Sequence, residues 1–99
     1  MDYEKQLEND TVCVSYLKLM PHEEIGEHYD VYPHVVIALQ GGVVTRLEAD
    51  GSRVLVEFPT GKAVFRPAET PAKMHRTINA SNEEIVLIVV QLTSDPVPL

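Results

Sequence analysis

The sequence predicts an all-β domain, a sandwich or barrel of seven or eight short strands. Apolar and polar residues alternate in short segments, and turn residues separate these segments at fairly regular spacing. Prolines gather in the connections rather than in the centres of the segments. No segment has a sustained helical period, and residues 1–9 are expected as an N-terminal arm with at most one polar helical turn.

The first half of the chain supplies four expected strands. Residues 11–19 alternate as a partly buried strand does. Residues 34–39 are apolar on both faces, which is typical of a central strand or of one covered by a partner subunit. Residues 43–48 and 53–58 flank an Asp-Gly pair, and this arrangement predicts a hairpin because glycine tolerates the positive φ of the turn.

The second half is interrupted more often by proline and glycine. Proline fixes φ and lacks a backbone donor, so these residues favour breaks and rigid connections. We expect a break at 59–61, a short strand at 62–66, a rigid loop at 67–71, a strand at 73–78, a turn at 79–83, a continuously apolar strand at 85–92 and a loose tail at 93–99.

Composition indicates one small soluble domain over residues 1–99. Hydrophobic residues make up 44% and charged residues 23%, enough for a single core. No apolar stretch reaches the ~20 residues of a membrane span, and the N-terminus lacks the features of a signal peptide, so a cytoplasmic protein is expected. Cys13 is the single cysteine, which excludes an internal disulfide and favours a small buried hydrophobe.

Charge and hydropathy also limit the partners. A net charge of -7 without a basic patch disfavours nucleic acid and anionic membranes, which leaves a small-molecule ligand or another protein. The strands at 34–39 and 85–92 carry more apolar surface than one small interior covers. We therefore expect a homodimer.

Two imidazoles and a carboxylate lie close together before one of these strands. His28 and Asp30 are two residues apart, so their side chains share a face if the segment is extended, and His34 follows at the start of the strand. Imidazole and carboxylate groups together suit divalent Fe, Mn, Ni, Zn or Cu. The segment therefore predicts a metal site.

This segment resembles the first of two motifs of the cupin family. That motif is a Gly, five residues, His-x-His, three or four residues, Glu, six residues and Gly; here His28, Asp30, His34 and Gly41 fall at matching spacings. The second motif is a Gly, five residues, Pro-x-Gly, two residues, His, three residues and Asn. Its counterparts here are Gly61, Pro67, His75 and Asn79, with Glu69 in place of the Gly and three extra residues before His75.

The resemblance covers about residues 8–92, and it is nearest to small single-domain cupins named for β-alanine degradation. It implies a double-stranded β-helix, or jelly-roll, barrel that holds a divalent metal with three His and one Glu. The corresponding set in this chain is three His and one Asp: His28, Asp30, His34 and His75. Counting forward from Pro67 places Ala72 at the last ligand position, whereas counting back from Asn79 places His75 there, and we favour His75.

Several of these residues also have a structural interpretation that involves no metal. Asp30 suits a turn, in which it would accept hydrogen bonds from nearby amides. His34 suits a neutral barrel histidine that fills the space of the family's Glu. His22 is expected as a solvated loop histidine, and Asn79 as a residue that caps the following turn.

The resemblance implies two classes of function. One is a metal-dependent enzyme, an oxygenase, isomerase or decarboxylase, acting on a small organic substrate, with oxygenase ahead if the metal is iron. The alternative is a noncatalytic module that binds a small molecule or a metal, and a purely structural dimer is a third class. A general acid or base would separate them, but a surface loop explains Arg66, Glu69 and Lys73 equally well.

Overall fold

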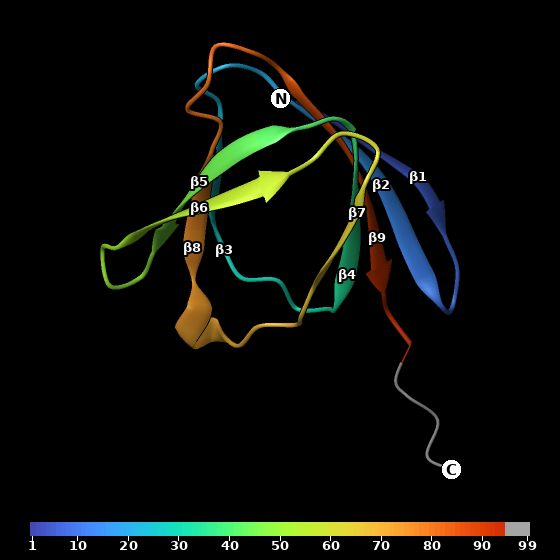
Figure 1. The fold of residues 1–99 in the computed structure, drawn as a ribbon. Coiled ribbons are helices and arrows are strands. Elements are labelled where there is room, and N and C mark those ends of the chain that lie inside the picture. Colours follow the sequence, from blue (N-terminus) through green and yellow to red (C-terminus); the bar gives the residue numbers. More distant parts are fainter. Residues whose placement is uncertain (95–99) are drawn as a thin grey trace.

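The computed structural model describes residues 1–94, which form two β-sheets that face each other (Figure 1). The strand order is β1-β2-β9-β4-β7 in one sheet and β3-β8-β5-β6 in the other. The all-β prediction is confirmed. The elements are β1 (Asp2–Glu8), β2 (Val12–Leu19), β3 (Glu24–His28), β4 (His34–Gln40), β5 (Gly42–Glu48), β6 (Arg53–Phe58), β7 (Ala63–Arg66), the 3-10 turn η1 (Pro71–Lys73), β8 (His75–Ile78) and β9 (Ile85–Leu92).

The core lies between the sheets and comes from the inward positions of both. β2 alternates half-buried and buried residues along its whole length, because successive side chains of a strand point to opposite faces. Full burial of an aliphatic or aromatic core side chain contributes about 1.5–3 kcal/mol. The buried core consists of Leu17, Leu19, Val36, Ala38, Val44, Phe58, Ile85 and Leu87.

The hairpin expected at the Asp-Gly pair is confirmed as β5 and β6. Gly51 has a φ of 89°, and its amide donates to the Glu48 carbonyl at 3.0 Å. The Ser52 amide donates to the Asp50 carboxylate at 2.8 Å. Glycine relieves the steric cost of the positive φ, which fixes the turn and with it the register of the two strands.

The N-terminal segment is a strand rather than an arm with a helical turn. β1 pairs antiparallel with β2 at the edge of the five-stranded sheet, and all its residues are exposed. The Tyr3 hydroxyl is 3.0 Å from Ser15 Oγ. An edge strand with both faces in water needs no apolar period, because its backbone hydrogen bonds to the neighbouring strand hold it.

Two further boundaries differ from expectation. Glu24–His28 is strand β3, which was not assigned from the sequence because its residues are mostly polar. The strand expected at 73–78 begins only at His75, because Pro71 favours the first turn of η1, which ends at Lys73. The expected loose tail falls largely on residues 95–99, outside the described residues. Within residues 1–94, no helix has the length and apolarity needed to cross a bilayer.

The connection between β4 and β5 passes very close to the end of β6. The Gly41 amide donates to Thr60 Oγ1 at 2.8 Å. A Cβ atom at position 41 would lie 2.0 Å from the Phe58 carbonyl oxygen and 2.7 Å from the Thr60 amide nitrogen. Only glycine therefore fits this position without a movement of the backbone.

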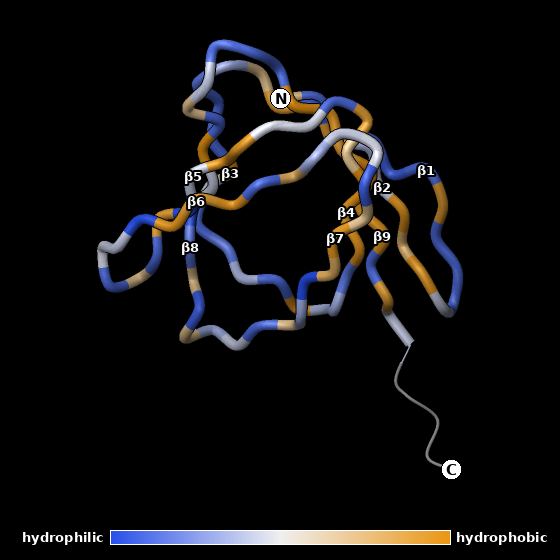
Figure 2. The backbone as a smooth tube through the Cα atoms, viewed as in Figure 1, coloured by the Kyte–Doolittle hydropathy of each residue, from blue (hydrophilic) through white to orange (hydrophobic). Residues whose placement is uncertain are grey.

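The outer face of the five-stranded sheet is apolar across its central strands. In register, Ile37 of β4 lies opposite Ile88 of β9, which lies opposite Tyr16 of β2. Most of β2, β4 and β9 is coloured hydrophobic, whereas the connections at their ends are largely hydrophilic (Figure 2). Both β4 and β9 are internal strands, so the prediction of a central position for residues 34–39 is confirmed.

Candidate metal centre

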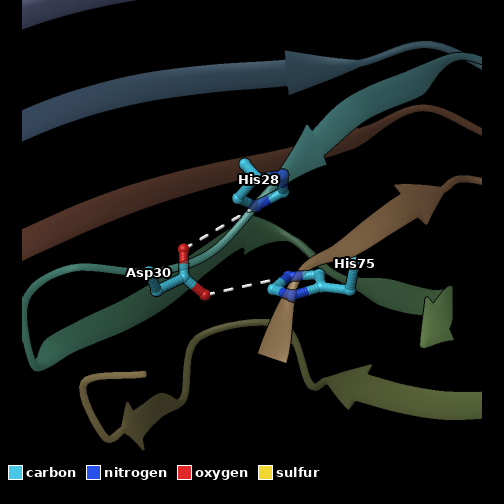
Figure 3. Close-up of side chains that lie close together, drawn as sticks. All are labelled: His28, Asp30 and His75. Carbon is cyan, nitrogen blue, oxygen red and sulfur yellow. Dashed lines mark ion pairs between the residues drawn. The ribbon is translucent and has the colours of Figure 1, made fainter. Parts of the chain in front are cut away.

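Three of the four predicted ligands meet at one end of the space between the sheets. His28 ends β3, Asp30 follows it, and His75 begins β8. His28 and His75 are partners in the β3–β8 register, and their ring centroids lie 4.4 Å apart. The Asp30 carboxylate lies between them: Oδ1 is 3.7 Å from His28 Nε2, and Oδ2 is 3.9 Å from His75 Nε2 (Figure 3).

The main chain orients each ring in the same way. His28 Nδ1 is 2.7 Å from the Gly26 carbonyl oxygen, and His75 Nδ1 is 2.8 Å from the Lys73 carbonyl oxygen. A carbonyl can only accept, so Nδ1 carries the proton and the neutral ring keeps its lone pair on Nε2. Those lone pairs are the ones near Asp30. Such hydrogen bonds from the far nitrogen are the usual support of metal-bound histidine.

The spacing of the ligand atoms is suitable for one cation. One atom from each of His28, Asp30 and His75 lies within 4.8 Å of the others. A tetrahedral ion with bonds of about 2.0–2.1 Å separates its ligand atoms by about 3.4 Å. The nitrogen-to-oxygen distances of 3.7 and 3.9 Å, each to a different oxygen of Asp30, exceed that value, so the side chains would have to move closer together to bind an ion.

A buried ion pair supports the Asp30 loop from outside the cluster. The Asp30 amide donates to Glu69 Oε1 at 3.1 Å, and the Glu69 amide donates to the Asp30 carbonyl at 2.7 Å. Arg46 donates to Glu69 through one terminal nitrogen and to Glu48 through Nε at 2.7 Å. Glu69 Oε1 also lies 3.5 Å from His75 Nδ1.

This arrangement keeps Glu69 ionised. Burial raises the pKa of its carboxyl group, but the hydrogen bonds from Arg46 and from the Asp30 amide outweigh burial and hold the pKa below its usual value. An ionised carboxylate engaged by a guanidinium is a poor proton donor. Glu69 therefore acts as a positioning residue for Asp30 and His75.

The histidine cluster opens into a cavity of about 160 Å³ between the sheets. Much of its wall is apolar and includes Val36, Phe58, Leu87 and Val89. Polar side chains also line it, among them the cluster His28, Asp30 and His75. A compact molecule with both apolar and polar groups fits this lining.

His34 lies on the same cavity but outside the three-residue cluster. It is 8% exposed, and its Nδ1 is 3.0 Å from the Tyr32 carbonyl oxygen, the same backbone hydrogen bond that the other two rings make. The competing candidate Ala72 is exposed in η1 and borders a depression on the outside. His22 lies in an exposed loop with a φ of 66°, away from the cluster.

Two residues of the site escaped the sequence analysis, and one was misjudged. Arg46 and Gln91 both line the cavity, and Glu69, interpreted as a loop residue, is half-buried in an ion pair. Arg46 shares its face of β5 with buried Val44, and a charge at an inward position requires a buried partner. The polar residue in that apolar alternation was the signal that could have revealed the pair.

The chain is similar in fold to several solved structures. No protein-family model matches the chain, and no curated protein matches it. A cupin domain from Bordetella pertussis Tohama I has a TM-score of 0.81 at 24% identity, with 92% of this chain and 91% of that chain covered. A cupin family protein with a double-stranded β-helix fold from Methanocaldococcus jannaschii has a TM-score of 0.69 at 20% identity, with 92% and 78% covered.

One similar structure is an enzyme. The polyketide cyclase RemF from Streptomyces resistomycificus has a TM-score of 0.66 at 18% identity, with 96% of this chain and 66% of that chain covered. Identities this low show the fold alone. The chain therefore has the double-stranded β-helix fold of cupin proteins, as the sequence predicted, and its chemistry must be argued from its own residues.

Proposed function

We propose that the protein binds one divalent transition-metal ion through His28, Asp30 and His75. The observation that carries this proposal is the shared orientation of the two rings, whose Nδ1 atoms face backbone carbonyls while their Nε2 atoms flank one carboxylate. Two ring nitrogens and one carboxylate that face each other are a donor set suited to a divalent cation.

The ligand set favours iron and oxygenase chemistry within this proposal. Two histidines and one carboxylate on one face, with other positions open, are the set that non-haem Fe(II) oxygenases use. A bound ion supplies a Lewis acid at an open position, and iron adds redox chemistry. The chain itself contributes ligand orientation through the backbone and a cavity with a largely apolar wall beside the cluster.

His34 is the proposed fourth ligand, in the place where the family resemblance expects a Glu. Its ring has the same backbone hydrogen bond as the other two, and it lines the same cavity. The set would then be three imidazoles and one carboxylate. The wider distance of His34 from the cluster means that it would bind only after a side-chain movement.

A noncatalytic binding module is the second candidate function. The observation that favours it is the ion pair of Glu69 with Arg46. Glu69 is the carboxylate beside His75, and a carboxylate held by a guanidinium is poorly suited to act as a general acid or base. Such a module would bind metal and ligand through the same residues without turnover.

Metal content and turnover test the proposal in that order. Elemental analysis of protein purified without an affinity tag and without added metal should find one divalent transition-metal ion per protomer. Protein that contains no metal and binds none in titrations with Fe(II), Mn(II) and Zn(II) would overturn it. Oxygen consumption by the iron-loaded protein with a panel of small organic acids then separates the oxygenase from the binding module.

A further inference from the structure

A row of polar side chains crosses the cavity wall opposite the cluster. Arg66 of β7 is the register partner of His34 of β4, and His34 is the register partner of Gln91 of β9. Directly opposed residues of antiparallel strands share a face, so all three side chains point to the inside of the sandwich. All three line the cavity. The cavity thus has the candidate metal cluster on one side and, facing it, a wall on which Arg66 and Gln91 flank His34.

The two arginines of the cavity differ in their partners. Arg46 is held by Glu48 and Glu69. Arg66 makes no ion pair and no side-chain hydrogen bond with any residue from 1 to 94, although it is half-buried. Every buried side-chain nitrogen and oxygen in residues 1–94 has a hydrogen-bond partner. The guanidinium nitrogens of Arg66 have no such partner there, so they are not buried and remain accessible. An accessible guanidinium in a partly buried site recognises carboxylates through paired hydrogen bonds.

The position of Arg66 also suits a ligand that enters from outside. Arg66 borders both the inner cavity and the open depression beside it, which has a volume of about 760 Å³. That depression is lined by Lys73 as well as by acidic residues of the β5–β6 hairpin. Arg66 is therefore placed where a ligand at the mouth of the cavity could reach its guanidinium.

We infer that the cavity binds a small organic acid whose carboxylate is held by Arg66, with the Gln91 amide as a second donor. This inference rests on the proposed metal site, toward which the other end of the acid points. Drug-sized ligand sites measure roughly 300–1,000 Å³. The cavity of about 160 Å³ limits the acid to a few carbon atoms, and the Val36, Leu87 and Val89 side chains favour an aliphatic body.

The test compares acids with their amides on metal-loaded protein. Propionate, butyrate and succinate are titrated against propionamide and butyramide, and binding is followed by backbone amide chemical shifts in NMR spectra. At least one acid should bind about tenfold or more tightly than any amide, because a charged hydrogen-bonded pair is lost in the amide. Equal binding of acids and amides, or no saturation by any acid, would overturn the inference.

Variants assign the effect to the guanidinium. Arg66→Gln should weaken acid binding about tenfold or more and leave amide binding unchanged, and Arg66→Lys should retain part of the affinity because it keeps the charge but not the paired geometry. The control is Arg53→Gln on exposed β6, which should change nothing. Metal per protomer should stay at the wild-type value in all three variants. Undiminished acid binding by folded Arg66→Gln would contradict the inference while leaving the metal site intact.

Failure of the proposed metal site can be distinguished from failure of the proposed role of Arg66. If the protein binds no metal, Arg66 should still make it prefer acids over amides, and the same probes measure this preference on metal-free protein. Loss of metal binding with retained acid preference rejects the metal site alone. Retained metal binding without acid preference rejects the role of Arg66 alone.

Discussion

Asp30 and Glu69 are joined by two reciprocal hydrogen bonds although 39 residues separate them. The amide of each residue donates to the other, once to a carboxylate and once to a carbonyl, so the loop after β3 and the loop after β7 form one unit. Arg46 fixes the carboxylate from the β5 strand. The candidate ligand Asp30 is thereby held by a different part of the chain from the strand that carries His28.

The Arg46–Glu69 pair should stabilise the fold cooperatively. Both side chains are nearly buried, at 9% and 12% exposure, so Glu69→Gln leaves part of the Arg46 charge uncompensated. We expect a loss of about 1–3 kcal/mol in the free energy of unfolding, measured by urea denaturation. Arg46→Gln with Glu69→Gln should cost less than the sum of the two single variants. Strictly additive losses would mean that the pair does not couple.

The cluster should lose its metal when His75 is removed. His75→Ala deletes one of the three proposed ligands, so metal per protomer measured by elemental analysis should fall strongly while circular dichroism stays unchanged. His22→Asn is the matched control, because asparagine tolerates the positive φ at that loop position and the residue lies outside the cluster. Ala72→His should add no metal. Wild-type metal content in folded His75→Ala would remove His75 from the site.

His34 should change the coordination of the ion rather than its presence. If its Nε2 is a fourth ligand, the visible absorption of the Co(II)-substituted protein should differ between wild type and His34→Ala, with stoichiometry retained and affinity lowered about tenfold. Identical Co(II) spectra would identify His34 as a wall residue of the cavity.

The apolar outer face of the five-stranded sheet should mediate a homodimer. Ile37 and Ile88 lie opposite each other at its centre, and a continuous apolar sheet face is unfavourable in water. Light scattering should give twice the mass of the chain at micromolar concentration, and Ile37→Lys should give the monomer. Leu55→Lys, on the exposed β6 strand of the other sheet, is the control. A monomeric wild type would show that the face needs no second copy.

Gly41 should be intolerant of any side chain. Gly41→Ala places a methyl group against the Phe58 carbonyl and the Thr60 amide, and the backbone must move, at a cost of about 1–3 kcal/mol. Gly26→Ala is the comparison, since no atom lies within 4 Å of a Cβ at that position. Equal melting temperatures of the two variants would contradict the close approach.

The elements that the sequence predicts correctly are those specified by patterns among neighbouring residues. The alternation of β2 and the Asp-Gly turn between β5 and β6 follow from neighbouring residues alone, and both were predicted. β1 and β3 were missed because their residues are mostly polar and exposed, which leaves no apolar period in the sequence.

The site was only partly predictable for a related reason. The shared face of His28 and Asp30 follows from a spacing of two, whereas the approach of His75 depends on the register of β3 with β8. The Arg46–Glu69 pair joins segments that no local pattern relates. The likeness to β-alanine degradation cupins stays a prediction, since the similar structures share the fold alone.

β3 has a kinetic consequence for the centre at its end. It lies at the sheet edge, hydrogen-bonded only to β8, and its register is broken between Ile25 and His28. A short strand with one neighbour opens locally at a far smaller free-energy cost than the whole domain. Fraying of β3 would carry His28 away from Asp30 and His75 while the core stays folded. We therefore expect the residence time of a ligand at this site to follow the opening rate of β3, which amide hydrogen exchange measures.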